Sequence, residues 1–237
     1  MRSNRPTRAD EPDEAGCTGT VGGGCVTAIS TQRDQDRVNI FLDGAFAFGL
    51  PADLVAMAGL AVGEELSEER VAALLVQDEV ARATSAALVF LGYRPRSERE
   101  VRDRLRQKGY GPAAIAGAIA RLEGWHYLDD ADFARRWVEN RTTHRPRGRR
   151  LLEQELRHKG IDPETAREVI ADAEVDETGA ALELARAKLR AHAGEEPVVI
   201  RRKLGAFLGR RGYGYDTIRP VLDQLLGEGE EDKPEPD

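Results

Sequence analysis

The acidic cluster Asp129-Asp130-x-Asp132 is the group of side chains in this sequence that best fits a metal or acid–base site. The same residues also fit the start of a helix. Asp130 stands where an N-cap is needed, and Asp132 falls in the first turn, where negative charge meets the positive end of the helix dipole. We therefore favour helix capping over catalysis for this cluster.

Other catalytic patterns are absent from the sequence, which has no Walker loop, no nucleophile elbow and no His-Glu-x-x-His. The four histidines are not at metal-ligand spacing, and Cys17 and Cys25 have no second pair nearby to complete a tetrahedral site. The run Gly22–Gly24 follows no strand and opens no helix, which disfavours a phosphate cradle. We predict a protein that is not an enzyme and that needs no metal and no cofactor.

Clustered cations give a stronger indication of function. Between Arg141 and Lys159 there are seven cations and two glutamates, a net charge of 7 − 2 = +5, and a second basic group lies between Arg94 and Lys108. Lys108 and Lys159 directly precede glycines that can end helices, where a cation complements the negative end of the helix dipole. These two lysines therefore have a structural explanation.

The segment Arg145–Arg150 has no such explanation, because it covers a linker and the first turn of a predicted helix, where cations oppose the dipole. A local cost of this kind favours a binding role toward an acidic protein surface or a phosphate backbone. The predicted partner-binding residues are Arg94, Arg96, Arg99, Arg102, Arg141, Arg145, Arg147, Arg149 and Arg150.

The composition is that of an acidic, soluble protein. The chain has 237 residues, 41% hydrophobic and 32% charged residues, only 5% aromatic residues and a formal net charge of −7. This composition suits several small helical bundles better than one thick aromatic core, and the negative charge argues against nucleic acid as the sole partner. No apolar run approaches the roughly 18 residues that span a bilayer, and no signal peptide is recognisable. We expect a cytoplasmic protein without membrane contact.

The elements that carry these residues form an internal repeat. Three segments align without gaps, and each places an i, i+4 apolar pair on one face of a helix and then stops at a glycine. The glycines stand 160 − 109 = 51 and 212 − 160 = 52 residues apart, where each helix needs a left-handed residue after its last turn. The apolar pairs are Val101 and Leu105, Leu152 and Leu156, and Leu204 and Leu208; the glycines are Gly109, Gly160 and Gly212.

Each glycine is followed by an apolar residue and a new helix start, at Gly111-Pro112, at Asp162-Pro163 and at Asp216 before Thr217. A further helix precedes each pair, over 83–91, 131–142 and 180–191. The fold class is therefore mainly α, a tandem array of three three-helix units that lean on their neighbours. The predicted units cover 79–126, 127–175 and 176–226.

A small β-hairpin and helix module is predicted ahead of the repeats, over 26–78. A first strand over Val26–Gln32 is followed by Val38–Leu42, and Asp43-Gly44 offers a hairpin turn into the next strand. Pro51 can start a helix that Gly59 ends, and Ser67 can cap another. Residues 1–25 and the acidic segment 227–237 have little to bury, and we expect both to be disordered.

With these residues identified, the chain resembles the RecX family in three places. The first is Arg94–Glu100 followed by Leu105 and Lys108-Gly109-Tyr110, the second is Gly124–Ala134, and the third is Phe207–Tyr213. The second signature contains Tyr127, Leu128, Asp129, Asp130 and Phe133. The resemblance covers about 83–226, and residues 1–78 resemble an extension that only some members carry.

The resemblance implies a monomer that lodges in the groove of a RecA filament and restrains filament growth, ATP hydrolysis and strand exchange in recombination and DNA repair. Its basic groups would face RecA, with weak contacts to single- or double-stranded DNA. Two alternatives remain open. Three-helix units with a glycine turn also have the outline of a helix-turn-helix, which would bind DNA without RecA. An enzyme that uses Asp129, Asp130 and Asp132 would depend on a metal.

Overall fold

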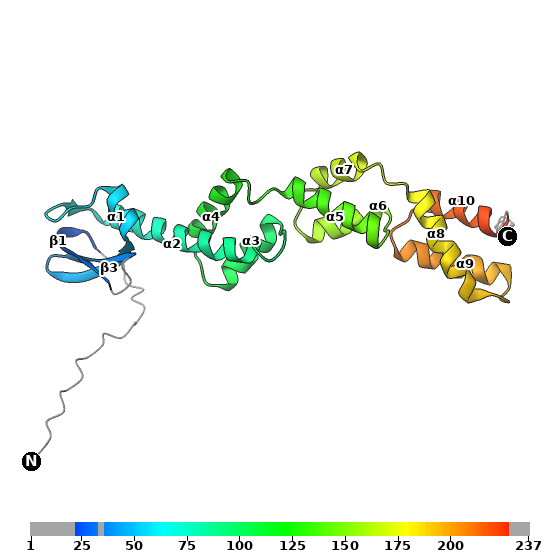
Figure 1. Cartoon of the computed structure of the whole chain (residues 1–237), viewed down its shortest axis with the longest axis horizontal. Coiled ribbons are helices and arrows are strands. Elements are labelled where there is room, and N and C mark those ends of the chain that lie inside the picture. The colour runs from blue at the N-terminus through cyan, green and yellow to red at the C-terminus, as the bar shows by residue number, and fades with distance from the viewer. Residues whose placement is uncertain (1–21, 33–35, 228–237) are drawn as a thin grey trace, which may run out of the picture. The chain divides into compact units, whose positions relative to one another are not determined.

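The computed structural model describes residues 22–32 and 36–227, so the predicted disorder of residues 1–21 and 228–237 lies outside the described part of the chain. The chain divides into two compact units, one up to Asp78 and one from Glu79 onward, and the division falls within helix α2 (Glu68–Leu91). The strands lie in the first unit, and the second unit is helical (Figure 1).

The first unit is a four-stranded antiparallel sheet with the strand order β3-β2-β1-β4. Asp43 and Gly44 both have positive φ angles, 50° and 83°, as a tight hairpin turn requires. The core of the unit contains Val26, Ile40 and Leu50, each fully buried. The elements are β1 (Gly24–Thr31), β2 (Arg37–Leu42), β3 (Ala45–Pro51), α1 (Ala52–Ala58) and β4 (Glu65–Leu66).

Two predictions for this part of the chain need correction. Gly24 and Cys25 belong to β1 and not to a disordered tail, because they pair with Leu66 and Glu65 of a short strand that the sequence did not reveal. The helix after Ser67 does not end before the first repeat but runs on to Leu91 as a single 24-residue helix. No glycine or proline interrupts this stretch, so nothing in the backbone stops the helix.

The second unit contains the three predicted three-helix units, which we call repeats 1, 2 and 3. Repeat 1 comprises the end of α2, α3 (Glu98–Gln107) and α4 (Pro112–Gly124). Repeat 2 comprises α5 (Asp130–His144), α6 (Arg149–His158) and α7 (Pro163–Asp172). Repeat 3 comprises α8 (Glu177–Leu189), the 3₁₀ turn η1 (Arg190–His192), α9 (Pro197–Arg210) and α10 (Tyr215–Leu226).

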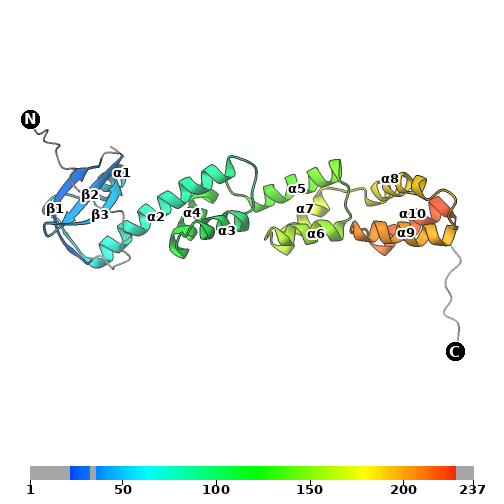
Figure 2. The ribbon, with the colours of Figure 1, turned by 90° about the horizontal axis from the view of Figure 1, so that it is seen from below.

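Each repeat has its own hydrophobic core. In repeat 2 the core consists of residues such as Leu152, Leu156 and Ile161, which are at most 2% exposed. The helices α5, α6 and α7 lie side by side in both views, and α8, α9 and α10 do the same (Figure 1, Figure 2). Because separate cores fill the repeats, the contacts that join one repeat to the next must come from groups outside these cores.

The predicted helix ends are confirmed. Gly109, Gly160 and Gly212 have φ angles of 85°, 87° and 89°, the left-handed conformation that glycine adopts without steric cost. Pro112 and Pro163 each occupy the first turn of a helix. The predicted start of the last helix at Asp216 is wrong, because the Gly214 carbonyl already accepts the amide of Ile218 and the helix begins at Tyr215.

Candidate partner-binding surface

The acidic cluster at the start of α5 serves helix ends. Asp129, not Asp130, caps α5, and its carboxylate accepts the Asp132 amide at 2.8 Å. Asp130 instead accepts the amide of Glu98 at the start of α3, also at 2.8 Å. Asp132 pairs with Arg136 at 2.7 Å. Within the described ranges, no three His, Cys, Asp or Glu side chains come close enough together to hold a metal ion.

The start of α3 meets the end of α6, and the start of α6 meets the end of α9. The Ser97 hydroxyl donates to the carbonyl of Lys159 at 2.6 Å, and the Gly148 amide donates to the carbonyl of Arg211 at 2.9 Å. Ser97 and Gly148 occupy equivalent positions, as do Lys159 and Arg211, because each of the latter precedes the helix-ending glycine. The two junctions are therefore built alike, and the positive end of one helix dipole meets the negative end of the next.

A carboxylate from the following repeat completes each junction. Asp130, the first residue of α5, accepts the first amide of α3, and Glu177, the first residue of α8, accepts the Arg149 amide of α6 at 2.5 Å. Burial raises the pKa of Asp130, and the nearby carboxylates of Glu98, Asp129 and Glu123 raise it further, against the hydrogen bond from the Glu98 amide. Glu177 offsets the unfavourable placement of Arg149 and Arg150 at the positive end of α6.

Glu100 connects repeats 1 and 2. Its carboxylate pairs with Arg94 at 2.9 Å and with Lys159 at 2.9 Å, and it also accepts the Ser97 amide in a capping box. Partial burial acts to raise the pKa of Glu100, but the hydrogen bonds and charges of Arg94 and Lys159 outweigh that effect and lower the pKa to about 2. Arg94, a predicted partner-binding residue, is therefore tied to this junction.

Two other predicted binding residues belong to an internal network around Glu155. Its carboxylate accepts the indole of Trp137 at 2.8 Å and pairs with Arg141 and Arg147, each at 2.9 Å. The Arg141 guanidinium also lies 4.1 Å from the centre of the Trp137 ring. The network fixes the linker between α5 and α6, so Arg141 and Arg147 position that linker.

Arg96 and Arg102 are also engaged within the protein. The guanidinium of Arg96 lies 4.1 Å from the centre of the Phe90 ring, and its pKa is lowered by burial and by the neighbouring charge of Arg94. Arg102 pairs with Glu98 one turn earlier on α3. Arg145, Arg149 and Arg150 are exposed, and none of their guanidinium groups forms an ion pair with another described residue.

Some of the exposed arginines follow the repeat. Arg99, Arg150 and Arg202 stand 150 − 99 = 51 and 202 − 150 = 52 residues apart, the spacing of the helix-ending glycines. Each stands two residues before the first apolar residue of its pair, and two residues turn a helix by about 200°, so these arginines point away from the core. All three are exposed, as are Arg106, Arg157 and Arg210, which stand seven or eight residues, about two turns, later on the same helices. We call these six residues the arginine row.

Four members of the arginine row, Arg106, Arg157, Arg202 and Arg210, were not among the predicted binding residues. The repeat alignment contained the signal for Arg202, because it aligns with Arg99 and Arg150. In repeat 1 the row is partly compensated, since Asp103 pairs with Arg106 at 3.0 Å and lies 3.8 Å from Arg99. Gln154 and Ala206 stand at the equivalent positions in repeats 2 and 3. The arginines of the row in those repeats therefore have no acidic residue at the position of Asp103.

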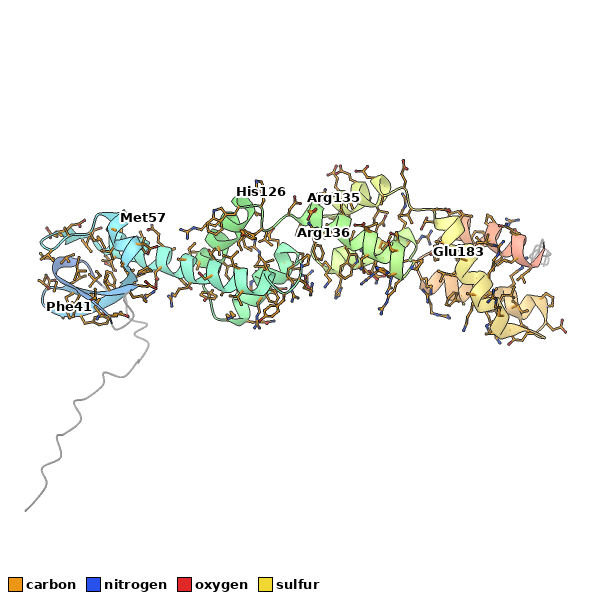
Figure 3. All side chains as sticks on the ribbon, in the orientation of Figure 1. Phe41, Met57, His126, Arg135, Arg136 and Glu183 are labelled. Carbon is orange, nitrogen blue, oxygen red and sulfur yellow. The ribbon has the colours of Figure 1, made fainter. Side chains whose placement is uncertain are left out.

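The second signature is largely structural. Leu128 packs into the core of repeat 1, and Phe133 packs into that of repeat 2. Tyr127 is 60% exposed. His126, labelled in Figure 3, lies two residues after the end of α4. Its φ angle is 58°. In the described part of the chain, no helix has the length and apolar character needed to cross a membrane.

Comparison with known proteins accounts for both units. Four family models match: the RecX N-terminal domain over residues 24–67, and the first, second and third RecX three-helix domains over residues 83–122, 129–170 and 175–222. Residues 1–78, expected to resemble an extension that only some members carry, thus contain a segment that matches a RecX domain model of its own. A short hairpin pattern carries little family-specific information, so this match is not apparent from the strand pattern alone.

Curated relatives carry the same description. The chain is 34% identical over 209 residues to the regulatory protein RecX of Bacillus subtilis (strain 168). The matched region covers 87% of this chain and 79% of that protein. It is 30% identical over 205 residues to the regulatory protein RecX of Clostridium botulinum (strain Eklund 17B / Type B), covering 85% of this chain and 96% of the relative.

A solved structure agrees with this assignment. The crystal structure of a regulatory protein RecX matches with a TM-score of 0.70 and 25% identity, covering 84% of this chain and 98% of that one. The structure of RecX from Lactobacillus salivarius, at 23% identity and a TM-score of 0.59, shows the same fold over 63% of this chain and 97% of its own. This chain belongs to the RecX family of regulatory proteins.

Proposed function

We propose that this protein is a non-enzymatic modulator, mainly an inhibitor, of RecA. In this proposal it acts in the cytoplasm as a monomer and binds in the groove of the RecA–DNA filament. There it limits filament growth, ATP hydrolysis and strand exchange. Membership of the RecX family supports a regulatory role, and the expectation that RecA is the target comes from the same resemblance.

The observation that carries the proposal is the arginine row. Equivalent cations at a fixed spacing suit a partner that is itself periodic, since each repeat can then make the same contact with successive subunits. Two similar junctions join the helices that bear the row, α3 to α6 and α6 to α9, which favours a constant spacing between its members. Of the nine arginines predicted from sequence, we retain Arg99, Arg145, Arg149 and Arg150 as contacts.

The test replaces one arginine in each repeat, in the variant Arg99→Gln/Arg150→Gln/Arg202→Gln. Exposed ion pairs contribute roughly 0.2–1 kcal/mol each, so losing three should weaken binding by about 3-fold to 100-fold. The assays are the DNA-dependent ATPase and strand exchange of RecA with added protein. A matched control is Arg135→Gln/Arg136→Gln, which removes two exposed cations from α5, outside the row (Figure 3).

Unchanged inhibition by the triple variant would remove the arginine row from the RecA contact. No effect of the unaltered protein on either activity, at several-fold excess over filament subunits, would refute the proposed function itself. The variant Arg145→Glu/Arg149→Glu tests the exposed part of the linker in the same assays. Its helicity should be unchanged by circular dichroism.

DNA binding without RecA is the second candidate, and the uncompensated row in repeats 2 and 3 is the observation that favours it. Contacts with phosphates release counterions, so this function predicts affinity for duplex DNA that falls steeply with salt. Binding that is already weak at about 50 mM salt would count against it.

A further inference from the structure

An open hollow lies where α6, α9 and α10 meet, between repeats 2 and 3. Its volume is about 520 Å³, and its polar side chains are those of Arg150, Gln154, Arg210 and two tyrosines. Gly209, which is exposed, and Gly212, which is buried, also line it, so backbone is accessible at Gly209. Tyr215 is 70% exposed at its rim. The hollow can therefore accept an extended stretch of chain.

The hollow is cationic and contains no acid. Arg150 and Arg210 come from different repeats, both are exposed, and neither forms an ion pair with a described residue. A neighbouring hollow of about 300 Å³ differs, because Glu177 and Asp216 line it beside Arg149 and Arg150. Two arginines that form no ion pair with a described residue favour a ligand that carries carboxylates or phosphates, since guanidinium groups bind both in bidentate fashion.

The same chain contains a segment of matching charge. Residues 227–237, the acidic segment, hold six acids and one lysine, a net charge of −6 + 1 = −5. The segment begins next to repeat 3, since Arg201 of α9 pairs with Asp223 at 2.6 Å and also donates to the carbonyl of Gly227. Its starting point is thus held against α9.

The acidic segment is long enough to reach the hollow. Helix α10 has 12 residues and so is about 18 Å long, and the hollow lies at its start while the acidic segment begins at its end. The ten residues 228–237 could span up to about 33 Å if extended. Linkage through one short helix also keeps the effective concentration of the carboxylates in the millimolar range, which allows even weak pairs to form.

We propose that the acidic segment docks in this hollow of its own chain, with its carboxylates on Arg150 and Arg210. Docking covers two members of the arginine row, so an anionic partner must displace the segment to reach them. The proposal rests on the shape of the hollow and on the opposite charges of its arginines and of the acidic segment. It does not require RecA to be the anionic partner.

The experiment measures proximity in the full chain. A nitroxide label is attached at Pro236→Cys in a Cys17→Ser/Cys25→Ser background, which leaves every charge of the segment in place. The amide signals of Gly209 and Gly212 are followed by NMR, with Gly227 as the positive control for the label. At low ionic strength we expect paramagnetic broadening of Gly209 and Gly212. At 1 M salt, where the screening length is about 3 Å, the broadening should be lost.

Two variants locate the contact. Arg150→Gln/Arg210→Gln, and separately replacement of the six acids by amides, should each abolish the broadening of Gly209 and Gly212, while Arg135→Gln/Arg136→Gln should keep it. The proposal is overturned if these amides are not broadened at low salt, or if broadening survives in Arg150→Gln/Arg210→Gln. No assay here contains RecA, so failure of this inference is distinct from failure of the proposed function.

Discussion

Glu100 offers a pH-dependent test of the junction between repeats 1 and 2. The pKa of its carboxylate is lowered from 4.5 to about 2 in the folded protein, where burial is outweighed by the hydrogen bonds of Arg94 and Lys159. Because the folded pKa lies below the unfolded one, the carboxylate stabilises the fold above about pH 4.5, and that stabilisation is lost as the pH falls toward 2.

The magnitude follows from the size of this change. A fall of about 2.5 in pKa, at 1.36 kcal/mol for each pH unit, gives an upper bound of about 3 kcal/mol. The carboxylate is 19% exposed, so solvent screening reduces the contribution to about 1–2 kcal/mol. We therefore expect Glu100→Gln to lower the free energy of unfolding by about 1–2 kcal/mol at pH 7 and to have little effect near pH 2. The glutamine retains the capping box, which isolates the effect of charge.

Urea unfolding of both proteins from pH 7 down to pH 2 checks this expectation. Trp137 fluorescence reports on the junction, because the Lys159 ammonium lies 5.1 Å from the centre of its ring. Glu139→Gln is the control, since Glu139 is exposed on α5 and makes no ion pair with a described residue. An equal difference between Glu100→Gln and the unaltered protein at pH 7 and at pH 2 would refute the ionic account of this junction.

Three further substitutions test the fold. Gly109→Ala should lower the free energy of unfolding by about 1–2 kcal/mol, because alanine is strained at a φ of 85°. Gly160→Ala should lower it by about 1–3 kcal/mol more, because its new Cβ would lie 2.5 Å from the Arg99 Cβ. Equal losses for the two variants in urea unfolding would contradict the close junction. Leu156→Ala removes a fully buried side chain and should cost about 2–5 kcal/mol, and a loss below about 1 kcal/mol would show that the repeat 2 core is assigned wrongly. His126→Gly should raise stability by about 1 kcal/mol, measured by thermal unfolding, because glycine relieves the left-handed backbone at φ 58°; a decrease would mean that the His126 side chain makes stabilising contacts.

The predicted site divides according to whether a residue's partner is local in sequence. Exposure of Arg149 and Arg150 could be predicted, because their position in a first helical turn gives them no structural purpose. The roles of Arg141 and Arg147 could not be predicted, since both pair with Glu155 on the next helix. Nothing in a run of arginines shows which of them a distant carboxylate will hold.

The sequence by itself determined the helical repeat, the helix ends at Gly109, Gly160 and Gly212, and the family signatures. These features depend on the periodicity of apolar residues and on backbone conformation, and both act over a few neighbouring residues. Only the tertiary structure decided how the repeats join. Asp130 looks like a cap for its own helix, yet it accepts the Glu98 amide 32 residues away. Such a hydrogen bond depends on which helix ends meet in space, and that arrangement leaves no periodic pattern in the chain.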